Sequence, residues 1–249
     1  MQSRYDKILS ILSREKRVTV AELSNELQVS GVTIRKDLSE LERNGLLRRE
    51  HGYATILNSD DVSTRLLFNY DVKRRIAQNT LESIKDGETI MIESGSCCAL
   101  LAEEVAKNRR DVTIITNSVF IATFIRNKPG AHIILLGGEF QNESQVMVGP
   151  LIKKCVASFY VNKFFIGTDG FNDFGAMSGD LMRAEAVRDM SENAQQTIIL
   201  TESKKFSQIG VVPLLAYDKI SAIYTDDKIG NSVKQNLGAK NIIINTLII

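Results

Sequence analysis

Apolar residues recur at helical spacing in the first quarter of the chain. Tyr5, Ile8 and Leu12 lie at i, i+3 and i+7, which predicts an amphipathic helix with one buried face. Thr19 and Glu22 have the spacing of a capping box, in which each side chain binds the backbone amide of the other residue. A second helix is therefore expected to begin at residue 20 and to end near residue 27.

Ser30 is a favoured N-cap for a third helix, and Gly45 is a favoured residue just beyond its end. Because only two residues separate the second helix from Ser30, the two helices must cross steeply, as in a helix-turn-helix motif. On a helical wheel Ile34, Leu38 and Leu41 share one face of the third helix, which we expect to be buried. The opposite face is short and mostly polar, and consists of Val32, Lys36, Ser39 and Arg43, flanked by Thr33 and Arg35.

A β-hairpin is expected after the third helix. The residues on both sides of Gly52 are strand-like, and Arg48, Arg49 and His51 lie near the turn, where they would form a wing that contacts DNA phosphates. Arg and Lys side chains bind guanine, the methyl groups of Thr and Val contact thymine, and hydroxyl groups bind phosphate. A solvated helix face on an ordinary three-helix domain is the alternative for the third helix, and the adjoining wing favours DNA binding. The candidate DNA-binding residues are Thr19, Ser30, Val32, Thr33, Arg35, Lys36, Ser39, Arg43, Arg48, Arg49 and His51.

A polar segment without periodicity, residues 58–64, separates two parts of different character. It is followed by a helical stretch over residues 65–84, which we interpret as a connecting helix. The expected organisation is a winged helix-turn-helix domain over residues 1–57, a linker and connecting helix over residues 58–84, and a larger domain over residues 85–249.

Short apolar runs alternate with helical stretches from residue 88 onward. The expected strands cover residues 89–93, 112–116, 132–136, 163–166, 197–201, 222–225 and 241–244. The helical stretches between them include residues 97–107, 119–126, 180–195 and 229–237. This alternation predicts an α/β domain with a doubly wound parallel sheet that is covered on both faces.

Small or polar residues follow most of these strands. In doubly wound domains ligands bind beyond the carboxyl ends of the strands, where helix N-termini present free amide groups. A glycine after one strand is usually no more than a turn, but several loops of the same chemistry at one edge favour a phosphate pocket. Lys204 would supply a point charge there, and the amide of Asn117 a hydrogen-bond donor. The candidate effector-binding residues found in this way are Ser94, Gly95, Ser96, Cys97, Asn117, Ser118, Gly137, Gly138, Gly167, Asp169, Gly170 and Lys204.

The N-terminal motifs resemble those of the DeoR family of bacterial transcription regulators. The resemblance is carried by residues 18–23, 29–38, 41–42 and 49–52. The chain departs from the family at Lys36, where a second arginine is usual, and at Tyr53, where a second glycine is common. Lys36 keeps the positive charge but lacks the bidentate fork of arginine, so its base preference would differ.

The resemblance extends over nearly the whole chain. The matching residues beyond the first domain are Lys73, Ile76, Ala77, Asp86, Gly87, Ser94, Gly95, Thr116, Asn117, Ser118, Gly137, Gly138, Gly149, Asp169, Gly170, Glu185, Ser203 and Lys204. It implies a C-terminal domain related in fold to ribose-5-phosphate isomerase and coenzyme A transferases, which senses phosphorylated sugars. It also adds Thr116 and Glu185 to the candidate effector-binding residues. The sequence Glu93-Ser94-Gly95-Ser96-Cys97-Cys98 departs from the usual Asp-Ser-Gly-Thr-Thr, which would alter the choice of sugar phosphate.

Composition excludes several other classes of protein. The 249 residues carry 31 Lys and Arg against 30 Asp and Glu, so there is no polybasic tail. No apolar run is long enough to span a membrane, and no export core opens the chain, so we expect a cytoplasmic protein without a membrane partner. The three cysteines have no metal-ligand spacing, and neither a disulfide framework, a metal site nor a cofactor is expected.

The resemblance implies a repressor of carbohydrate-metabolism genes whose binding to DNA responds to a phosphorylated sugar. The sequence leaves two alternatives to this function. Asp169, Glu185 and Lys204 could serve as the catalytic groups of a sugar-phosphate isomerase. Neither histidine, His51 nor His132, lies in the loops that follow the strands, so we expect no catalytic residue. A metabolite-storage or scaffold module would require a vestigial helix-turn-helix. One recognition helix reads only a few base pairs of double-stranded operator DNA, so we expect a homodimer or a homotetramer.

Overall fold

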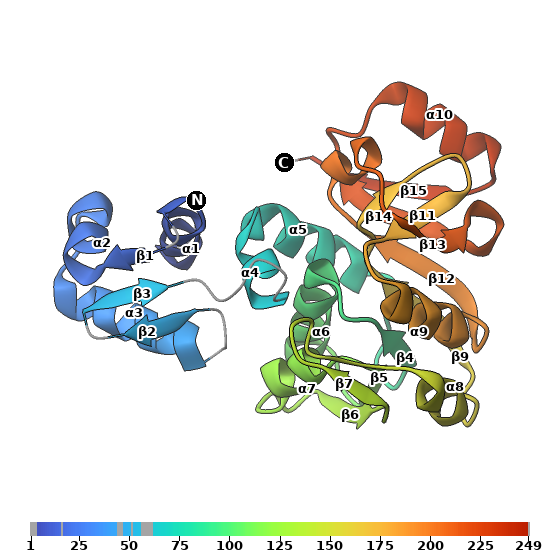
Figure 1. The fold of residues 1–249 in the computed structure, drawn as a ribbon, viewed down its shortest axis with the longest axis horizontal. Coiled ribbons are helices and arrows are strands. Elements are labelled where there is room, and N and C mark those ends of the chain that lie inside the picture. The colour runs from blue at the N-terminus through green and yellow to red at the C-terminus, as the bar shows by residue number, and fades with distance from the viewer. Residues whose placement is uncertain (1–3, 16, 44–46, 51, 56–61, 249) are drawn as a thin grey trace. The chain divides into compact units, whose positions relative to one another are not determined.

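The computed structural model describes residues 4–15, 17–43, 47–50, 52–55 and 62–248, and it forms two compact units that divide between Asp71 and Val72 (Figure 1). We call them unit 1 and unit 2. The expected helix end at Gly45, the candidate His51 and most of the expected linker, residues 58–61, lie outside the described residues.

Unit 1 contains the three expected helices around one apolar core. They are α1 (Arg4–Glu15), α2 (Val20–Leu27) and α3 (Gly31–Arg43), and a fourth helix, α4 (Val62–Leu67), follows later in the chain. The capping box at the start of α2 is confirmed, because Thr19 Oγ1 accepts from Glu22 N at 3.2 Å and Glu22 Oε2 accepts from Thr19 N at 2.7 Å. The predicted buried faces are confirmed too, with Ile34, Leu38 and Leu12 at most 1% exposed.

The expected wing is present, and it belongs to a three-stranded antiparallel sheet. The strands are β1 (Arg17–Thr19), β2 (Arg48–Glu50) and β3 (Tyr53–Thr55), in the order β1-β3-β2. Gly52 has a φ of 84°, which lets the two wing strands turn back on each other. The sequence did not predict β1, because three residues directly before a capping box show no alternating pattern. Buried Val18 and Ala54 face the helices, so the other side of the sheet faces solvent.

The prediction of a single connecting helix over residues 65–84 is wrong. The chain forms α4 and then a separate helix, α5 (Tyr70–Leu81). Asn69 stands between them with a φ of 52°, in the left-handed region where a right-handed helix cannot continue. The division between the units falls in the first turn of α5, so the expected linker boundary at residue 64 lies inside α4.

Unit 2 is built on a parallel sheet of seven strands, and each corresponds to one that the sequence predicts. They are β4 (Thr89–Ile92), β5 (Val112–Thr116), β6 (Ala131–Leu135), β9 (Val161–Ile166), β12 (Ala194–Leu200), β14 (Ala222–Asp226) and β15 (Ile243–Leu247). Their order is β15-β14-β12-β9-β4-β5-β6. The chain therefore starts in the interior of the sheet, moves outward to β6, and returns to lay down β9 on the other side of β4. The gap between β4 and β9 is a topological switch point.

Helices cover both faces of this sheet. They are α6 (Ser96–Asn108), α7 (Val119–Ile125), α8 (Pro150–Val156), α9 (Leu181–Ser191) and α10 (Asn231–Ala239), with α5 at the start of the unit. Right-handed crossovers that run in opposite directions from the switch point place α6 and α7 on one face and α9 and α10 on the other. Phe164 and Phe165, neighbours in β9, point to opposite faces and are both fully buried. The sheet is thus doubly wound, as expected.

Several short elements at the carboxyl edge of the sheet were not predicted. They are the hairpin of β7 (Glu139–Gln141) and β8 (Val146–Val148), and an antiparallel sheet of β10 (Gly170–Phe171), β11 (Gly175–Ser178) and β13 (Val212–Ala216). These strands form no part of the main sheet, and they were not marked by the apolar runs that predicted its strands. The helix expected over residues 180–195 ends at Ser191, because β12 begins at Ala194. No helix in the described part of the chain is long and apolar enough to cross a membrane.

Candidate DNA-binding surface and effector site

The outer face of α3 is open to solvent in unit 1. Val32 is 73% exposed, and Arg35, Lys36, Ser39 and Arg43 are exposed as well. Arg43 is paired with Glu40 of the same helix at 2.5 Å, so part of its charge is neutralised. Arg35 and Lys36 form no ion pair with any residue that the structure describes, so they are the available cations of this face.

The candidate hydroxyl groups are already hydrogen-bonded. Ser30 Oγ accepts from Thr33 N at 3.2 Å and lies 2.8 Å from Thr33 Oγ1, while Ser39 Oγ donates to the carbonyl of Arg35 at 2.8 Å. Thr19 Oγ1 donates to Glu22 Oε2 at 2.7 Å. These hydrogen bonds fix the starts of α2 and α3 and engage the hydroxyl group on the exposed face of α3, so the groups left available on that face belong to longer side chains.

The wing and the first helix brace α3. The side chain of Arg49 donates to Ser39 Oγ, and its backbone amide donates to Glu42 Oε1 at 2.8 Å. On the other side of α3, Arg4 binds the buried carboxylate of Asp37 through two hydrogen bonds, of 2.5 and 2.9 Å. Arg49 therefore lies beside the outer face of α3 rather than at the wing turn, whereas Arg48 is exposed on the solvent side of the wing.

In unit 2, Glu93 joins the two loops at the switch point. Its Oε2 accepts from Gly95 N at 2.9 Å and from Gly167 N at 3.0 Å, and its Oε1 accepts from Ser94 Oγ at 2.8 Å. A Cβ on Gly95 would lie 3.2 Å from both the Gly167 Cα and Glu93 Oε2, so glycine allows the two loops to approach this closely. The carboxylate thus holds the loops after β4 and β9 in one arrangement.

The amino end of α6 begins in the loop that Glu93 holds. Its N-cap, Gly95, has no side chain, and no side chain in the described part of the structure binds the amides of Ser96 and Cys97. Unbonded amides at the positive end of a helix of 13 residues attract an anion. Desolvation raises the pKa of Cys97 to about 12, against the opposing effect of Lys73, so this thiol stays protonated. Burial likewise raises the pKa of Cys98, so neither group is an active thiolate.

Two lysines meet one carboxylate after β12. Glu202 Oε1 lies 3.1 Å from Lys204 Nζ, and Glu202 Oε2 lies 3.7 Å from Lys73 Nζ of α5. The Lys73 and Glu202 side chains are 5% and 6% exposed, whereas that of Lys204 is 45% exposed. All three charges act on the pKa of Cys97, so this group lies close to the amino end of α6. Lys204 is the more exposed of the two lysines, so its ammonium group can supply positive charge beside the amino end of α6.

The loop after β5 is tied to the β7–β8 hairpin. Asn117 Nδ2 donates to the carbonyl of Met147 at 3.0 Å, and Asn117 Oδ1 is buried without a partner among the described residues. The group expected to donate to a ligand thus already donates to the hairpin, and the free atom is an acceptor. Ser118 Oγ caps α7 by accepting from Ile121 N at 3.1 Å, and Thr116 Oγ1 accepts from Ser118 N at 3.0 Å.

The remaining candidates fall into three groups. Asp169 Oδ2 accepts from Gly179 N at 2.8 Å and lies 3.9 Å from a guanidinium nitrogen of Arg183, at the start of α9. Gly138 and Gly170 are required by packing, because a Cβ would lie 2.6 Å from the Val148 carbonyl oxygen in one case and 2.2 Å from that of Gln208 in the other. Gly137 and Glu185 are exposed, and neither forms a hydrogen bond or ion pair with the other loops among the described residues.

The sequence had signals for residues that were not among the candidates. Glu93 and Glu202 directly follow apolar strands, as the candidate residues do, and their carboxylates connect loops. Lys73 stands in the apolar stripe of α5 with Ile76 and Ala77, where an ammonium group must find a partner. Arg183 had no signal, because its role depends on the position of α9.

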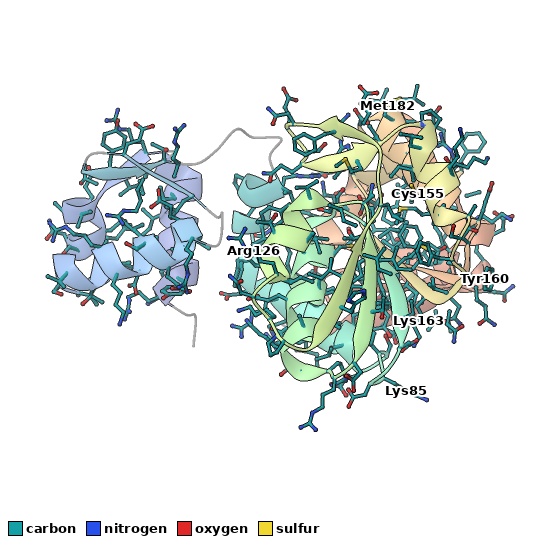
Figure 2. All side chains as sticks on the ribbon, turned by 90° about the horizontal axis from the view of Figure 1, so that it is seen from below. Lys85, Arg126, Cys155, Tyr160, Lys163 and Met182 are labelled. Carbon is teal, nitrogen blue, oxygen red and sulfur yellow. The ribbon has the colours of Figure 1, made fainter. Side chains whose placement is uncertain are left out.

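The amino edge of the sheet has a different character. Figure 2 shows Met182, in the first turn of α9, and Lys85, in the loop before β4, on opposite sides of unit 2. On the side of Lys85, the ammonium group of Lys163 donates to Glu88 Oε1 at 2.7 Å and to the carbonyl of Ser83 at 2.5 Å. The ammonium group of Lys163 is therefore satisfied within the unit.

Two family models match the chain. The model described as DeoR-like helix-turn-helix domain matches residues 4–60, and the model described as DeoR C terminal sensor domain matches residues 68–227.

Several curated proteins are similar over almost their whole length. The HTH-type transcriptional regulator GolR of Listeria innocua is 28% identical, with 92% of each chain covered. The lactose phosphotransferase system repressor of Staphylococcus epidermidis is 28% identical, over 90% of this chain and 91% of that repressor. The glycerol-3-phosphate regulon repressor of Escherichia coli K12 is 28% identical, with 94% of each chain covered. Among solved structures, ribose 5-phosphate isomerase A from Methanocaldococcus jannaschii matches 55% of each chain with a TM-score of 0.40 and 19% identity.

Proposed function

The chain belongs to the DeoR family of transcription regulators, and on this premise we propose that it is a repressor of carbohydrate-metabolism genes whose affinity for operator DNA changes when a phosphorylated sugar binds. The proposal is carried by two features together: an exposed face on α3, where Arg35 and Lys36 form no ion pair with a described residue, and in unit 2 the start of α6 without a side-chain cap beside two lysines. Two relatives support the ligand class, since their names refer to lactose and to glycerol 3-phosphate.

Arg35, Lys36 and Val32 are the proposed base-reading residues. Each is exposed on α3, and Arg and Lys donate to guanine while Val contacts the thymine methyl group. Arg49 is proposed to bind phosphate next to this helix and to hold the wing against it. Ser30, Thr33, Ser39 and Thr19 are proposed to support the helices, because their hydroxyl groups are already hydrogen-bonded within unit 1.

The effector's phosphate is proposed to bind at the amino end of α6. The amides of Ser96 and Cys97 and the ammonium group of Lys204 supply hydrogen bonds and charge there. Asn117 Oδ1 is a buried acceptor without a partner, and a sugar hydroxyl group is a donor that would satisfy it. The carboxylate of Asp169 can accept from a second hydroxyl group.

Catalysis is not part of the proposal. The three groups that an isomerase would use are engaged or separate, because Asp169 accepts from Gly179 N, Lys204 pairs with Glu202, and Glu185 is exposed on α9.

We propose that the chain forms a homodimer or a homotetramer through unit 2, because one α3 reads too few base pairs for useful specificity.

The DNA-binding part of the proposal is tested with Arg35→Ala in the full chain. Duplexes are first selected by the wild-type protein from a random-sequence library. Against a selected duplex, the substitution should weaken binding by about 1–3 kcal/mol and relax base preference at one position, because a bidentate base contact is lost. Competition binding with single-base variants of the duplex measures both effects.

Lys7→Ala is the matched control, since Lys7 is an exposed cation on α1. Its affinity and base preference should equal those of the wild-type protein. Selection of no duplex by the wild-type protein would contradict the proposed function, and an unchanged base preference in Arg35→Ala would remove Arg35 from base reading.

A further inference from the structure

An arginine of β1 lies over an aromatic ring of the wing. The guanidinium carbon of Arg17 is 3.3 Å from the centroid of the Tyr53 ring. Arg17 is exposed, and within the described part of the chain its guanidinium group has no hydrogen bond or ion pair. The sequence did not single out Arg17, because β1 itself was not predicted.

The direction in which Arg17 leans is set by the strand register. Its backbone is paired with Thr55, whereas Tyr53 is paired with Thr19. Tyr53 is two residues nearer the Gly52 turn than Thr55, about 7 Å along the sheet, so the contact between the two side chains spans this offset. This places the guanidinium group toward the end of the sheet that carries the wing turn.

The same end of the sheet carries the start of α2. Val20 N donates to the carbonyl of Gly52 at 3.3 Å, so the wing turn and the amino end of α2 are adjacent. Thr19, the N-cap of α2, is exposed there. The Arg17 guanidinium group thus approaches a rim formed by the helix-turn-helix on one side and the wing on the other.

Stacking leaves the donors of Arg17 free. A guanidinium group that lies on a ring keeps its N–H bonds in its own plane, directed past the edge of the ring. Tyr53 is itself held, because its hydroxyl group donates to Glu50 Oε2 at 2.5 Å. Less side-chain freedom is then lost when the planar donors meet an anion with a matching pair of oxygen atoms, and a phosphate is such an anion.

We propose that Arg17 binds a backbone phosphate of duplex DNA at this rim, and that Tyr53 is the positioning residue that holds it ready. The proposal rests on the proposed DNA-binding function and adds a contact outside α3 and the wing turn. Because a phosphate contact is independent of sequence, it acts on any duplex.

The test uses the full chain and a random-sequence DNA duplex, with affinity measured over a series of salt concentrations. Arg17→Gln should reduce the slope of log affinity against log salt by about one unit, because one fewer counterion is released. Tyr53→Leu should weaken binding about two- to fivefold, because the exposed cation–π contact is lost. That loss should disappear when Arg17→Gln is already present, a coupling that a merely structural role of Tyr53 would not produce.

Two further variants serve as controls. Tyr53→Phe keeps the ring and should bind with nearly the wild-type slope. Lys240→Ala removes a cation that lies 4.8 Å from the ring of Tyr217 in unit 2, and should leave the slope unchanged. Thermal unfolding of each variant shows that it is folded under the binding conditions.

The outcomes separate the inference from the function on which it rests. A wild-type slope in Arg17→Gln, with wild-type protein that binds the duplex, would overturn the role of Arg17 alone. Equal losses for Tyr53→Leu in both backgrounds would overturn the positioning role. Failure of the wild-type protein to bind any duplex at low salt would overturn both the inference and the proposed function.

Discussion

Replacing Glu93 by alanine is expected to lower the free energy of unfolding of unit 2 by about 3 kcal/mol or more and to abolish the response to phosphorylated sugars. The carboxylate accepts from Gly95 N, Gly167 N and Ser94 Oγ. Alanine would leave these donors unpaired in a buried place, and each unpaired donor carries a desolvation cost. The loops after β4 and β9 would then separate, and the amino end of α6 would lose its position. Chemical denaturation and effector-dependent DNA binding measure the two effects.

Two variants make this result specific. Glu88→Ala breaks the 2.7 Å ion pair with Lys163 at the opposite edge of the sheet, and should destabilise unit 2 while the effector response persists. Glu93→Gln keeps an acceptor for the two amides, since its amide group can donate to Ser94, and should remain folded with a weaker response. A full response in folded Glu93→Ala would contradict the role given to this carboxylate.

Lys204→Ala is expected to weaken effector binding about tenfold and to leave the affinity for operator DNA unchanged. A hydrogen bond from a charged group contributes about 1.5–3 kcal/mol, and the lower end applies because Lys204 is half exposed. The substitution removes the more exposed of the two ammonium groups beside Glu202, while Lys73 still pairs with that carboxylate in the interior. Titration of effector into a protein–DNA complex measures the shift.

Lys219→Ala is the control for the removal of a charge. Lys219 is exposed and precedes β14, so it lies at the amino edge of the sheet. It should titrate like the wild-type protein. If Lys204→Ala responded to the same effector concentration as the wild-type protein, Lys204 would have no part in the phosphate site.

The sheet of unit 2 could be predicted from the sequence because each of its strands is a separate apolar run between helices. A parallel strand that is buried on both faces shows its whole length as apolar residues, as Ile90, Met91 and Ile92 do in β4. The first three helices could be predicted for a similar reason, since caps and a regular stripe mark α2 and α3. These signals are local and do not depend on distant contacts.

The elements that were missed depend on distant contacts. β1 has three residues and becomes a strand because β3 pairs with it. The β7–β8 hairpin is held by Asn117, which is remote from it in sequence. The break between α4 and α5 depends on the left-handed backbone of Asn69, a conformation that asparagine only sometimes adopts.

The candidate sites show the same division. The residue types in the sequence predicted that the outer face of α3 and the loops at the carboxyl edge of the sheet are the two candidate sites. It did not show which of their atoms are free, because this depends on partners in three dimensions. The hydroxyl group of Ser39 accepts a hydrogen bond from Arg49, and the amide nitrogen of Asn117 donates to the hairpin, whereas the Asn117 oxygen has no partner among the described residues.

The central claim is that a phosphorylated sugar bound in unit 2 changes how tightly unit 1 holds DNA. The most direct measurement is the affinity of the full chain for a selected duplex, with and without each member of a panel of sugar phosphates and their unphosphorylated sugars. We predict that at least one phosphorylated sugar shifts the affinity about 5- to 150-fold while its unphosphorylated form does not. An affinity that stays constant across the whole panel, or that shifts equally with the unphosphorylated sugar, would contradict the claim.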